Sequence, residues 1–132
     1  ETHILIMGDF NDHPDNKSLS HTLQAKPIPV LPEKKELYNM FYHRMKERDF
    51  GSYKFQGRWE VLDQFIVSGN LLMRSNTLHL NENNALIFKE EFLLEEDTRY
   101  YGKKPYRTNT GPRFLGGFSD HLPIYMDLIV RL

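Results

Sequence analysis

The first hydrophobic segment of the chain is a short continuous run that ends at a glycine. It covers His3–Met7, and Gly8 follows it. A short apolar run without polar alternation is typical of a strand buried on both faces, and glycine favours a sharp turn after it. The sequence therefore predicts a buried strand that leads into a loop of sequence Gly-Asp-Phe-Asn-Asp, residues 8–12.

The middle of the chain carries the clearest hairpin pattern. Tyr53–Phe55 and Trp59–Val67 are rich in aromatic and β-branched residues, and Gln56-Gly57-Arg58 separates them. Two such runs around a short glycine-containing loop predict a β-hairpin. Alternation along the second strand predicts that Trp59, which we expect in the core, shares one face with Val61, Asp63, Phe65 and Val67.

One member of this face, Asp63, is a carboxylate in an otherwise apolar row. Burying an unpaired carboxylate is costly, so a cation, a metal ion or hydrogen-bond donors must meet it. A structural ion pair satisfies this requirement and is the simpler interpretation of the strand, and a catalytic role also satisfies it. The strand alone leaves both interpretations open.

Two segments have apolar residues at helical spacing. The first, His13–Leu23, has two leucines four residues apart and a start, His13-Pro14-Asp15, that suits a modest helix. The second, Glu36–Asp49, is expected to be an amphipathic helix that Gly51 ends. Its apolar positions are Leu37, Met40, Phe41 and Met45.

Short strand patterns and charged segments alternate in the C-terminal half. Thr77–Leu80 and Ala85–Phe88 predict short strands, and Pro123–Val130 predicts a longer closing strand. An acidic patch between them is expected to be a solvated loop; it consists of Glu90, Glu91, Glu95, Glu96 and Asp97. Arg99–Arg113 is expected to be a long basic loop with interleaved tyrosines.

This basic loop has two interpretations. Lysine or arginine beside aromatic side chains suits contact with a phosphate backbone or a phosphorylated headgroup, and Arg107 is our candidate for a substrate contact. The other interpretation is a solvated loop whose charge the preceding acidic patch balances.

Composition indicates a folded domain without a global charge preference. Hydrophobic residues make up 39% of the 132 residues and aromatic residues 13%, which is sufficient for a core. The 17 basic and 18 acidic side chains leave a net charge of −1, so any anionic substrate must be recognised locally. The absence of cysteine excludes a thiolate metal site and a cysteine nucleophile, and no apolar run is long enough for a membrane span.

Two further groups of polar residues lie at positions that suit catalysis. Asp9 and Asn11 follow the first predicted strand, and strand ends often carry functional groups in mixed α/β folds. Asp120 and His121 precede the closing strand and offer a metal-capable carboxylate and a group that titrates near neutrality. Each pair alone is also typical of an ordinary turn.

Three blocks in this order resemble the last three signature blocks of the endonuclease/exonuclease/phosphatase superfamily. They are Ile-Met-Gly-Asp-Phe-Asn-Asp at 6–12, Trp-Glu-Val-Leu-Asp-Gln-Phe-Ile-Val-Ser at 59–68 and Gly-Phe-Ser-Asp-His-Leu-Pro-Ile at 117–124. The resemblance implies an α/β (α+β) fold in which residues 1–132 form the C-terminal half of a two-sheet β-sandwich, with mostly antiparallel strands and flanking helices. The superfamily includes nucleases resembling pancreatic deoxyribonuclease, inositol-polyphosphate phosphatases, sphingomyelinases and deadenylases.

The resemblance also implies roles for the matching residues. Asp9 matches the carboxylate that orients or deprotonates the attacking water, and Asn11 matches an amide that helps to bind the phosphate. His121 matches the imidazole that faces the scissile phosphate, Asp63 the carboxylate that hydrogen-bonds it, and Asp120 a carboxylate at or near the metal site. The expected activity is hydrolysis of a phosphodiester or phosphomonoester with Mg²⁺ or Mn²⁺, for which Asp120 and Asp9 are the expected ligands.

One departure from the superfamily is large. The metal-binding glutamate and the asparagine of its first half have no counterpart in this sequence, so we expect the missing N-terminal half to be supplied in cis. The substrate can be a nucleic acid, a phosphoinositide or a phospholipid headgroup. A competing hypothesis is a catalytically incomplete fragment that self-associates or binds a partner, and the reading frame before Glu1 distinguishes the two.

Two geometric predictions follow from the resemblance. The residues Asp9, Asn11, Asp63, Asp120 and His121 should converge at one edge of the sheet. The Asp63 carboxylate should accept a hydrogen bond from the His121 ring, with a separation of roughly 2.6–3.2 Å.

Overall fold

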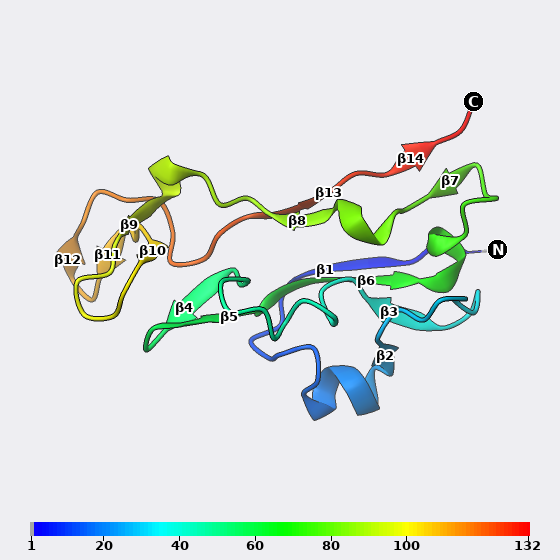
Figure 1. Cartoon of the computed structure of the whole chain (residues 1–132), viewed down its shortest axis with the longest axis horizontal. Helices are drawn as coiled ribbons and strands as arrows, with labels where there is room; N and C mark the ends of the chain where they lie inside the picture. Colours follow the sequence, from blue (N-terminus) through cyan, green and yellow to red (C-terminus); the bar gives the residue numbers. More distant parts are fainter. Residues whose placement is uncertain (1) are drawn as a thin grey trace.

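The computed structural model describes residues 2–132, and strands make up most of its regular structure (Figure 1). The strands are β1 (Leu5–Asp9), β2 (Ala25–Lys26), β3 (Leu37–Asn39), β4 (Tyr53–Phe55), β5 (Arg58–Glu60), β6 (Asp63–Ser68), β7 (Leu78–His79), β8 (Ala85–Ile87), β9 (Leu94–Glu96), β10 (Lys103–Pro105), β11 (Asn109–Thr110), β12 (Arg113–Phe114), β13 (Ile124–Met126) and β14 (Ile129–Val130). The short helices are a π-helix, η1 (Ser18–Thr22), and the 3₁₀ helices η2 (Gly69–Leu72), η3 (Glu82–Asn84) and η4 (Glu91–Leu93).

The largest sheet has four strands in the order β1-β6-β3-β2. β6 lies antiparallel between β1 and β3, whereas β2 pairs with β3 in parallel. The other strands form two-stranded antiparallel pairs, so the predicted predominance of antiparallel strands is confirmed. Within residues 2–132 no segment forms an α-helix, and the predicted flanking helices are reduced to short turns.

Both faces of β6 are buried, because its side chains alternate between two apolar clusters. Phe65 and Val67 point to the main core, and Ile66 belongs to a second cluster with Leu19 and Ala25. In the main core the Phe41 ring meets two other rings edge to face, Phe50 at 5.1 Å and Phe65 at 6.0 Å between centroids. The continuous apolar run of this strand is explained by these two contacts.

β1 occupies one edge of this sheet and is more exposed than predicted. The strand itself is confirmed over Leu5–Asp9, but Leu5 is 40% exposed and Met7 is 67% exposed. Only Ile6 packs against the second cluster. The prediction of burial on both faces is therefore wrong for the described residues, because neither apolar cluster covers Leu5 or Met7.

The predicted helix over Glu36–Asp49 is wrong. Its first residues, Leu37–Asn39, form β3, and the following residues form successive turns closed by bonds between residues three apart, such as Tyr42 N to Asn39 O and Arg44 N to Phe41 O. Pairing with β6 satisfies the backbone of β3, so strand pairing outweighs helical spacing here. The expected apolar face is nevertheless buried, since Met40 and Phe41 belong to the main core.

The predicted helix over His13–Leu23 is much shorter in the structure. Only Ser18–Thr22 is helical, and its Leu23 N–H bonds to the Ser18 carbonyl five residues back. The Asp12 carboxylate accepts hydrogen bonds from Ser18 and Asn16, and these bonds lower the pKa of Asp12 below its ordinary value. Side-chain bonds of this kind compete with a regular helix start.

The predicted hairpin at residues 53–60 is confirmed. β4 and β5 pair from Tyr53 opposite Glu60 to Phe55 opposite Arg58. Gln56 and Gly57, with φ of 47° and 81°, form the two-residue turn that hairpins of this length favour. The second strand, however, is interrupted at residues 61–62, so β5 and β6 are separate elements.

Trp59 lies outside the core, and its predicted burial is wrong. It is half-buried, and the Lys89 ammonium lies 3.6 Å from the centre of its ring. Loss of hydration lowers the pKa of Lys89. The indole therefore makes a cation–π contact at the surface rather than filling the interior.

The C-terminal half confirms the predicted strand segments and corrects the two predicted loops. β7 pairs with β14, and β8 pairs with β13, with a break at residues 127–128 inside the predicted closing strand. The acidic patch and the basic segment form the β9–β10 hairpin instead of separate loops, and opposite charges face each other across it. Strands β9–β12 lie at one end of the molecule, away from both chain ends (Figure 1).

No helix in residues 2–132 has the length and apolar character that crossing a membrane requires.

Candidate functional site

Asp9 and Asp63 meet across the β1–β6 pair. They are register partners at the last position of β1 and the first position of β6. Side chains of directly opposed residues lie on the same face of an antiparallel pair, so the two carboxylates share one side of the sheet. Asp9 is exposed, and the Asp63 side chain is 16% exposed.

The imidazole of His121 completes this group. Its Nδ1 lies 2.6 Å from Asp63 Oδ2, so the predicted hydrogen bond between these two residues is confirmed. The His121 side chain is 25% exposed, which leaves part of the ring open to a ligand. With Nδ1 donating to the carboxylate, the Nε2 atom is available for another partner.

Ser52 and Tyr53 hold both members of the Asp63–His121 pair. Ser52 Oγ accepts a hydrogen bond from the Asp63 N–H at 3.2 Å, and Ser52 O accepts one from the Leu122 N–H at 2.7 Å. Tyr53 forms an isolated backbone bridge with His121. The start of β4 therefore connects the strand that carries Asp63 with the loop that carries His121.

The Tyr53 side chain also covers the imidazole. The two ring centroids lie 4.8 Å apart, with a tilt of 31° between the planes. Arg107 donates a long hydrogen bond of 3.4 Å to the Tyr53 hydroxyl, and its guanidinium carbon lies 5.6 Å from the centre of the same ring. Arg107 thus lies one aromatic ring away from His121.

The loop after β1 turns sharply beside Asp9. Asn11 has φ of 51°, and its N–H donates to Asp9 Oδ1 at 2.8 Å. Buried Gln64 supports the loop from below, because its Nε2 donates to the Asp12 carbonyl and its Oε1 accepts from Asn39 Nδ2 at 2.6 Å. This buried amide pair fixes the loop through its backbone.

Asp120 is the predicted site residue that lies apart. It is exposed and borders a small surface hollow together with Arg107, Asn109 and Ser119. Among residues 2–132 the compact group of metal-capable side chains contains Asp9, Asp63 and His121 but not Asp120. The structure therefore brings three of the predicted residues together, with Asn11 beside them through its backbone.

The compact group has the spacing of a possible divalent-cation site. One ligand atom from each of Asp9, Asp63 and His121 lies within 4.8 Å of the others. Opposite ligands of an octahedral Mg²⁺ ion lie about 4.2 Å apart, and this ion prefers carboxylate oxygens and retains several water molecules. The donor set suits a hydrated divalent cation, with the exposed Asp9 as its main carboxylate, because Asp63 is already bonded to the imidazole.

The segment before His121 is placed by a close backbone contact. Gly117 N donates to the Arg107 carbonyl at 3.1 Å, and Phe118 N donates to the Tyr106 carbonyl at 2.7 Å. A Cβ atom on Gly117 would lie 2.2 Å from the Tyr106 carbonyl oxygen, so only glycine fits. This contact couples Arg107 to the loop that ends at His121.

Sequence reasoning missed the residues that support the site. Ser52, Tyr53, Asn39 and Gln64 act through contacts between segments distant in sequence. For Gln64 a signal existed, since it is a polar residue within an apolar strand and is fully buried. For Ser52 and Tyr53 no local pattern indicated the contact with residues 121–122.

Comparison with known proteins gives one result. A family model described as the Endonuclease/Exonuclease/phosphatase family matches residues 1–130. No curated protein and no solved structure matches the chain significantly.

Proposed function

Because this chain belongs to the endonuclease/exonuclease/phosphatase family, we propose that it takes part in hydrolysis of a phosphodiester or phosphomonoester by an activated water molecule. The observation that carries this proposal is the 2.6 Å hydrogen bond from His121 to Asp63 beside the Asp9 carboxylate. A histidine oriented by a carboxylate is the usual arrangement for an imidazole that stabilises charge or transfers a proton.

In this proposal His121 faces the scissile phosphate through Nε2. Asp63 fixes the tautomer and orientation of the ring. Tyr53 restricts the ring from one side, at 4.8 Å between centroids. Charge that develops on the phosphate oxygens in the transition state is then met by a preoriented donor.

Asp9 prepares the water. Its exposed carboxylate takes a proton from the water as the new oxygen–phosphorus bond forms. The ester oxygen–phosphorus bond breaks in the same step, and the released alkoxide takes a proton from solvent. Asn11 positions the water and the phosphate. Asp120 and Arg107 line the adjacent hollow, where Arg107 contacts the substrate. The family is generally dependent on divalent metal, and a Mg²⁺ or Mn²⁺ ion held by Asp9 would offset charge on the phosphate. Asp120 lies outside the compact group, so its proposed role as a further metal carboxylate requires a change in the position of its side chain.

We also propose that residues 1–132 are the C-terminal half of a two-sheet catalytic domain. The exposed outer edge of β1 supports this arrangement, since Leu5 and Met7 are apolar residues of an unpaired edge strand. Natural proteins usually cover or charge such edges. A second sheet packed on this side would bury them and would supply the remaining family residues.

The proposal is tested with the full-length gene product and a generic phosphodiester, bis(p-nitrophenyl) phosphate, in Mg²⁺ or Mn²⁺ and after chelation with EDTA. Asp9→Asn and His121→Ala should each lower kcat by about 10²- to 10⁴-fold, because these groups act on the reaction. His21→Ala is the matched control, since His21 is exposed and is not part of the group. Wild-type rates for both Asp9→Asn and His121→Ala contradict the catalytic assignment.

The exposed β1 edge also favours a second candidate, a catalytically incomplete module that self-associates or binds a partner. Light scattering and the phosphodiesterase assay on the isolated 132-residue chain distinguish the two. Concentration-dependent association without hydrolysis in any context supports the module. A monomer with metal-dependent activity contradicts both the module and the half-domain arrangement.

A further inference from the structure

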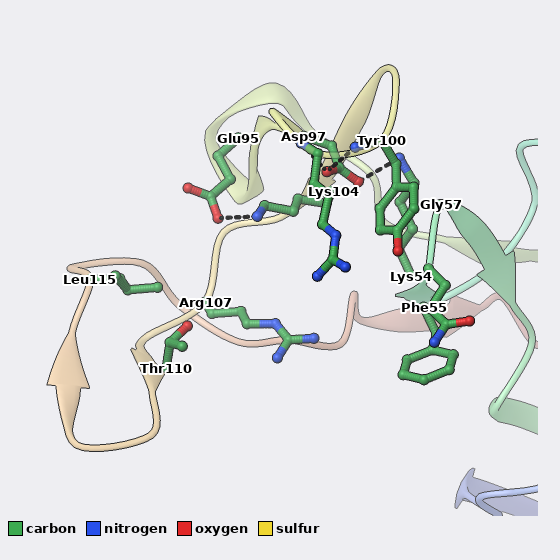
Figure 2. A pocket seen from close by; sticks show the side chains of 12 residues that line it. Lys54, Phe55, Gly57, Glu95, Asp97, Tyr100, Lys104, Arg107, Thr110 and Leu115 are labelled. Atoms are coloured by element: carbon green, nitrogen blue, oxygen red, sulfur yellow. Dashed lines mark hydrogen bonds and ion pairs between the residues drawn. The ribbon is translucent and has the colours of Figure 1, made fainter.

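A pocket of about 340 Å³ lies beside the candidate site, between the β4–β5 turn and the basic segment (Figure 2). Arg99, Lys104, Arg107 and Tyr100 line it from the basic segment, and Lys54 and Phe55 line it from β4. In Figure 2 the Arg107 guanidinium extends into the space between these two sides. The pocket therefore contains several cationic groups in a molecule whose net charge is −1.

The charges of the pocket do not balance. Lys54 pairs with Asp97 at 3.1 Å, and Lys104 pairs with Glu95 at 3.7 Å. Arg99 and Arg107 are the remaining charged residues of the lining, and within residues 2–132 neither has a carboxylate at ion-pair distance. Two guanidinium groups thus provide an excess positive charge at one place.

A buried ion pair, Lys54–Asp97, makes hydrogen bonds to the backbone around Arg99. Asp97 Oδ1 accepts hydrogen bonds from the backbone N–H groups of Tyr100 at 2.9 Å and Arg99 at 3.3 Å. The Lys54 ammonium, whose side chain is 3% exposed, donates to the Tyr101 and Lys103 carbonyls at 2.8 and 3.0 Å. This arrangement orders the segment before any ligand arrives, which lowers the entropic cost of binding.

Arg107 connects the pocket to the candidate site. Its guanidinium donates to the Tyr53 hydroxyl, and the Tyr53 ring lies against His121 at 4.8 Å between centroids. A ligand group bound by Arg107 is therefore adjacent to a phosphate at His121 but separate from it. Aromatic surface is available at the same place, because Phe55 is 50% exposed and Tyr100 lines the pocket.

We propose that Arg99 and Arg107 bind a second phosphate group of the substrate, next to the phosphate that is hydrolysed. This inference rests on the proposed function. A guanidinium offers paired donors that match phosphate oxygens, and two such groups without internal carboxylate partners suit an anion of high charge. The substrate class is a phosphate ester with at least two phosphates, as in an oligonucleotide or a polyphosphorylated headgroup.

The first test measures anion binding without catalysis. Inorganic phosphate is titrated into the full-length protein with EDTA present, and the arginine Nε–H signals of Arg99 and Arg107 are followed by NMR. Saturable shifts of both signals are expected, with at least fivefold weaker binding in Arg99→Ala. Arg113→Ala removes the same charge from an exposed position outside the pocket and should change the affinity less than twofold.

Two outcomes overturn the pocket assignment. One is the absence of saturable shifts at Arg99 and Arg107, and the other is an equal loss of affinity in Arg113→Ala. Arg99→Lys provides a folded comparison that keeps the charge and loses the paired donors, and its affinity should lie between those of the wild type and Arg99→Ala. An unchanged backbone spectrum verifies that each variant folds.

The second test compares substrates with one and two phosphates. The substrates with two phosphates are a 5′-phosphorylated dinucleotide and inositol bisphosphate, and bis(p-nitrophenyl) phosphate has one. The ratio of the KM for a two-phosphate substrate to the KM for bis(p-nitrophenyl) phosphate should be at least tenfold higher in Arg99→Ala than in the wild type. The dinucleotide and the inositol ester distinguish the two sources of the second phosphate. Hydrolysis with an unchanged KM ratio overturns the inference alone. Absence of hydrolysis of every substrate, with phosphate binding intact, overturns the proposed function and the second-phosphate role together.

Discussion

The central sheet and the charged segment at residues 90–118 are stabilised in different ways. In β6 every residue from Gln64 to Ser68 is buried, and the side chains pack into two apolar clusters. In residues 90–118 only Leu93 and Pro105 are buried, and the buried Lys54–Asp97 ion pair holds the turn of the β9–β10 hairpin through backbone hydrogen bonds. Apolar packing therefore fixes one region, and paired charges order the other.

This difference explains where the chemistry lies. The sheet provides Asp9 and Asp63 on opposed strands. The charged segment provides Arg107 and leads to His121, which Ser52 and Tyr53 then connect to the sheet. The candidate site is located at the junction of the two regions, so each region can be altered separately to test its contribution.

The largest effect is expected at the junction itself. Asp63→Asn keeps the size of the side chain but removes the charge that His121 faces at 2.6 Å. We expect kcat to fall by about 10²- to 10⁴-fold, with a small change in melting temperature, because the group orients a reacting imidazole.

Steady-state kinetics and thermal unfolding of the same preparation measure both quantities. Asp15→Asn is the matched control, since Asp15 is an exposed aspartate on the neighbouring loop. An equal loss of activity in both variants, or a loss that follows unfolding, contradicts the junction role of Asp63.

A core substitution tests the apolar region. Phe41 is fully buried against the rings of Phe50 and Phe65, so Phe41→Ala should destabilise the protein by about 3–5 kcal/mol. Denaturant unfolding measures this change, and activity per folded molecule should be retained. Phe92→Ala, at a side chain that is 58% exposed, is the control and should have a much smaller effect.

The β4–β5 hairpin and the Asp63–His121 contact were predictable from the sequence. Gln56 and Gly57 are a local sequence signal for the β4–β5 turn. The alternation along the following strand identified Asp63 as a charge that needs a partner. The identity of that partner came from the resemblance of the three sequence blocks rather than from the spacing of residues. The confirmed contact therefore combines a local argument with a family pattern.

The errors in residues 36–49 and 90–105 share a physical cause, which is strand pairing that the local pattern does not contain. The helical spacing in residues 36–49 is real, but β3 bonds to β6 and buried Asn39 bonds to Gln64. The acidic and basic segments also form a hairpin, in which opposite charges face each other. Local patterns do not contain these contacts, so sequence reasoning could not choose among the alternatives.

The charged region is tested through its buried ion pair. Lys54→Met leaves the Asp97 carboxylate, which is 5% exposed, without its cation, and a local loss of about 3 kcal/mol is expected. Hydrogen exchange should accelerate in residues 94–105 and remain slow in β6. Asp97→Leu in the same chain should recover part of the loss, whereas uniform destabilisation of the sheet contradicts separate regions.

Acid should affect this pair in a defined range. Burial opposes ionisation of Asp97, but the Tyr100 N–H, the Lys54 ammonium and the Arg99 N–H together hold the pKa of its carboxyl below its usual value. Its stabilisation is therefore complete above the unfolded pKa of about 3.9 and is lost as the pH falls through the lower folded pKa.

Hydrogen exchange in residues 94–105 from pH 6 to pH 2, corrected for intrinsic rates, should show opening only below about pH 4. An Asp97→Asn variant should lack this transition. Opening that begins near pH 6 in the wild type indicates a histidine and contradicts the assignment to Asp97.

The smallest effect is expected on the surface of the same hairpin. Lys103 contacts Glu91 and Glu96, which raise the pKa of Lys103, but both glutamate side chains are largely exposed, at 77% and 69%. Exposed ion pairs contribute little and are screened by salt. Lys103→Met should lower the melting temperature by less than about 4 °C in low salt and by almost nothing in 0.5 M salt. Thermal unfolding of Lys54→Met in the same buffers is the comparison. A large, salt-independent loss for Lys103→Met would mean that the surface charges, rather than the buried pair, order residues 90–118, and Arg99 would then lack the rigid support that its proposed phosphate contact requires.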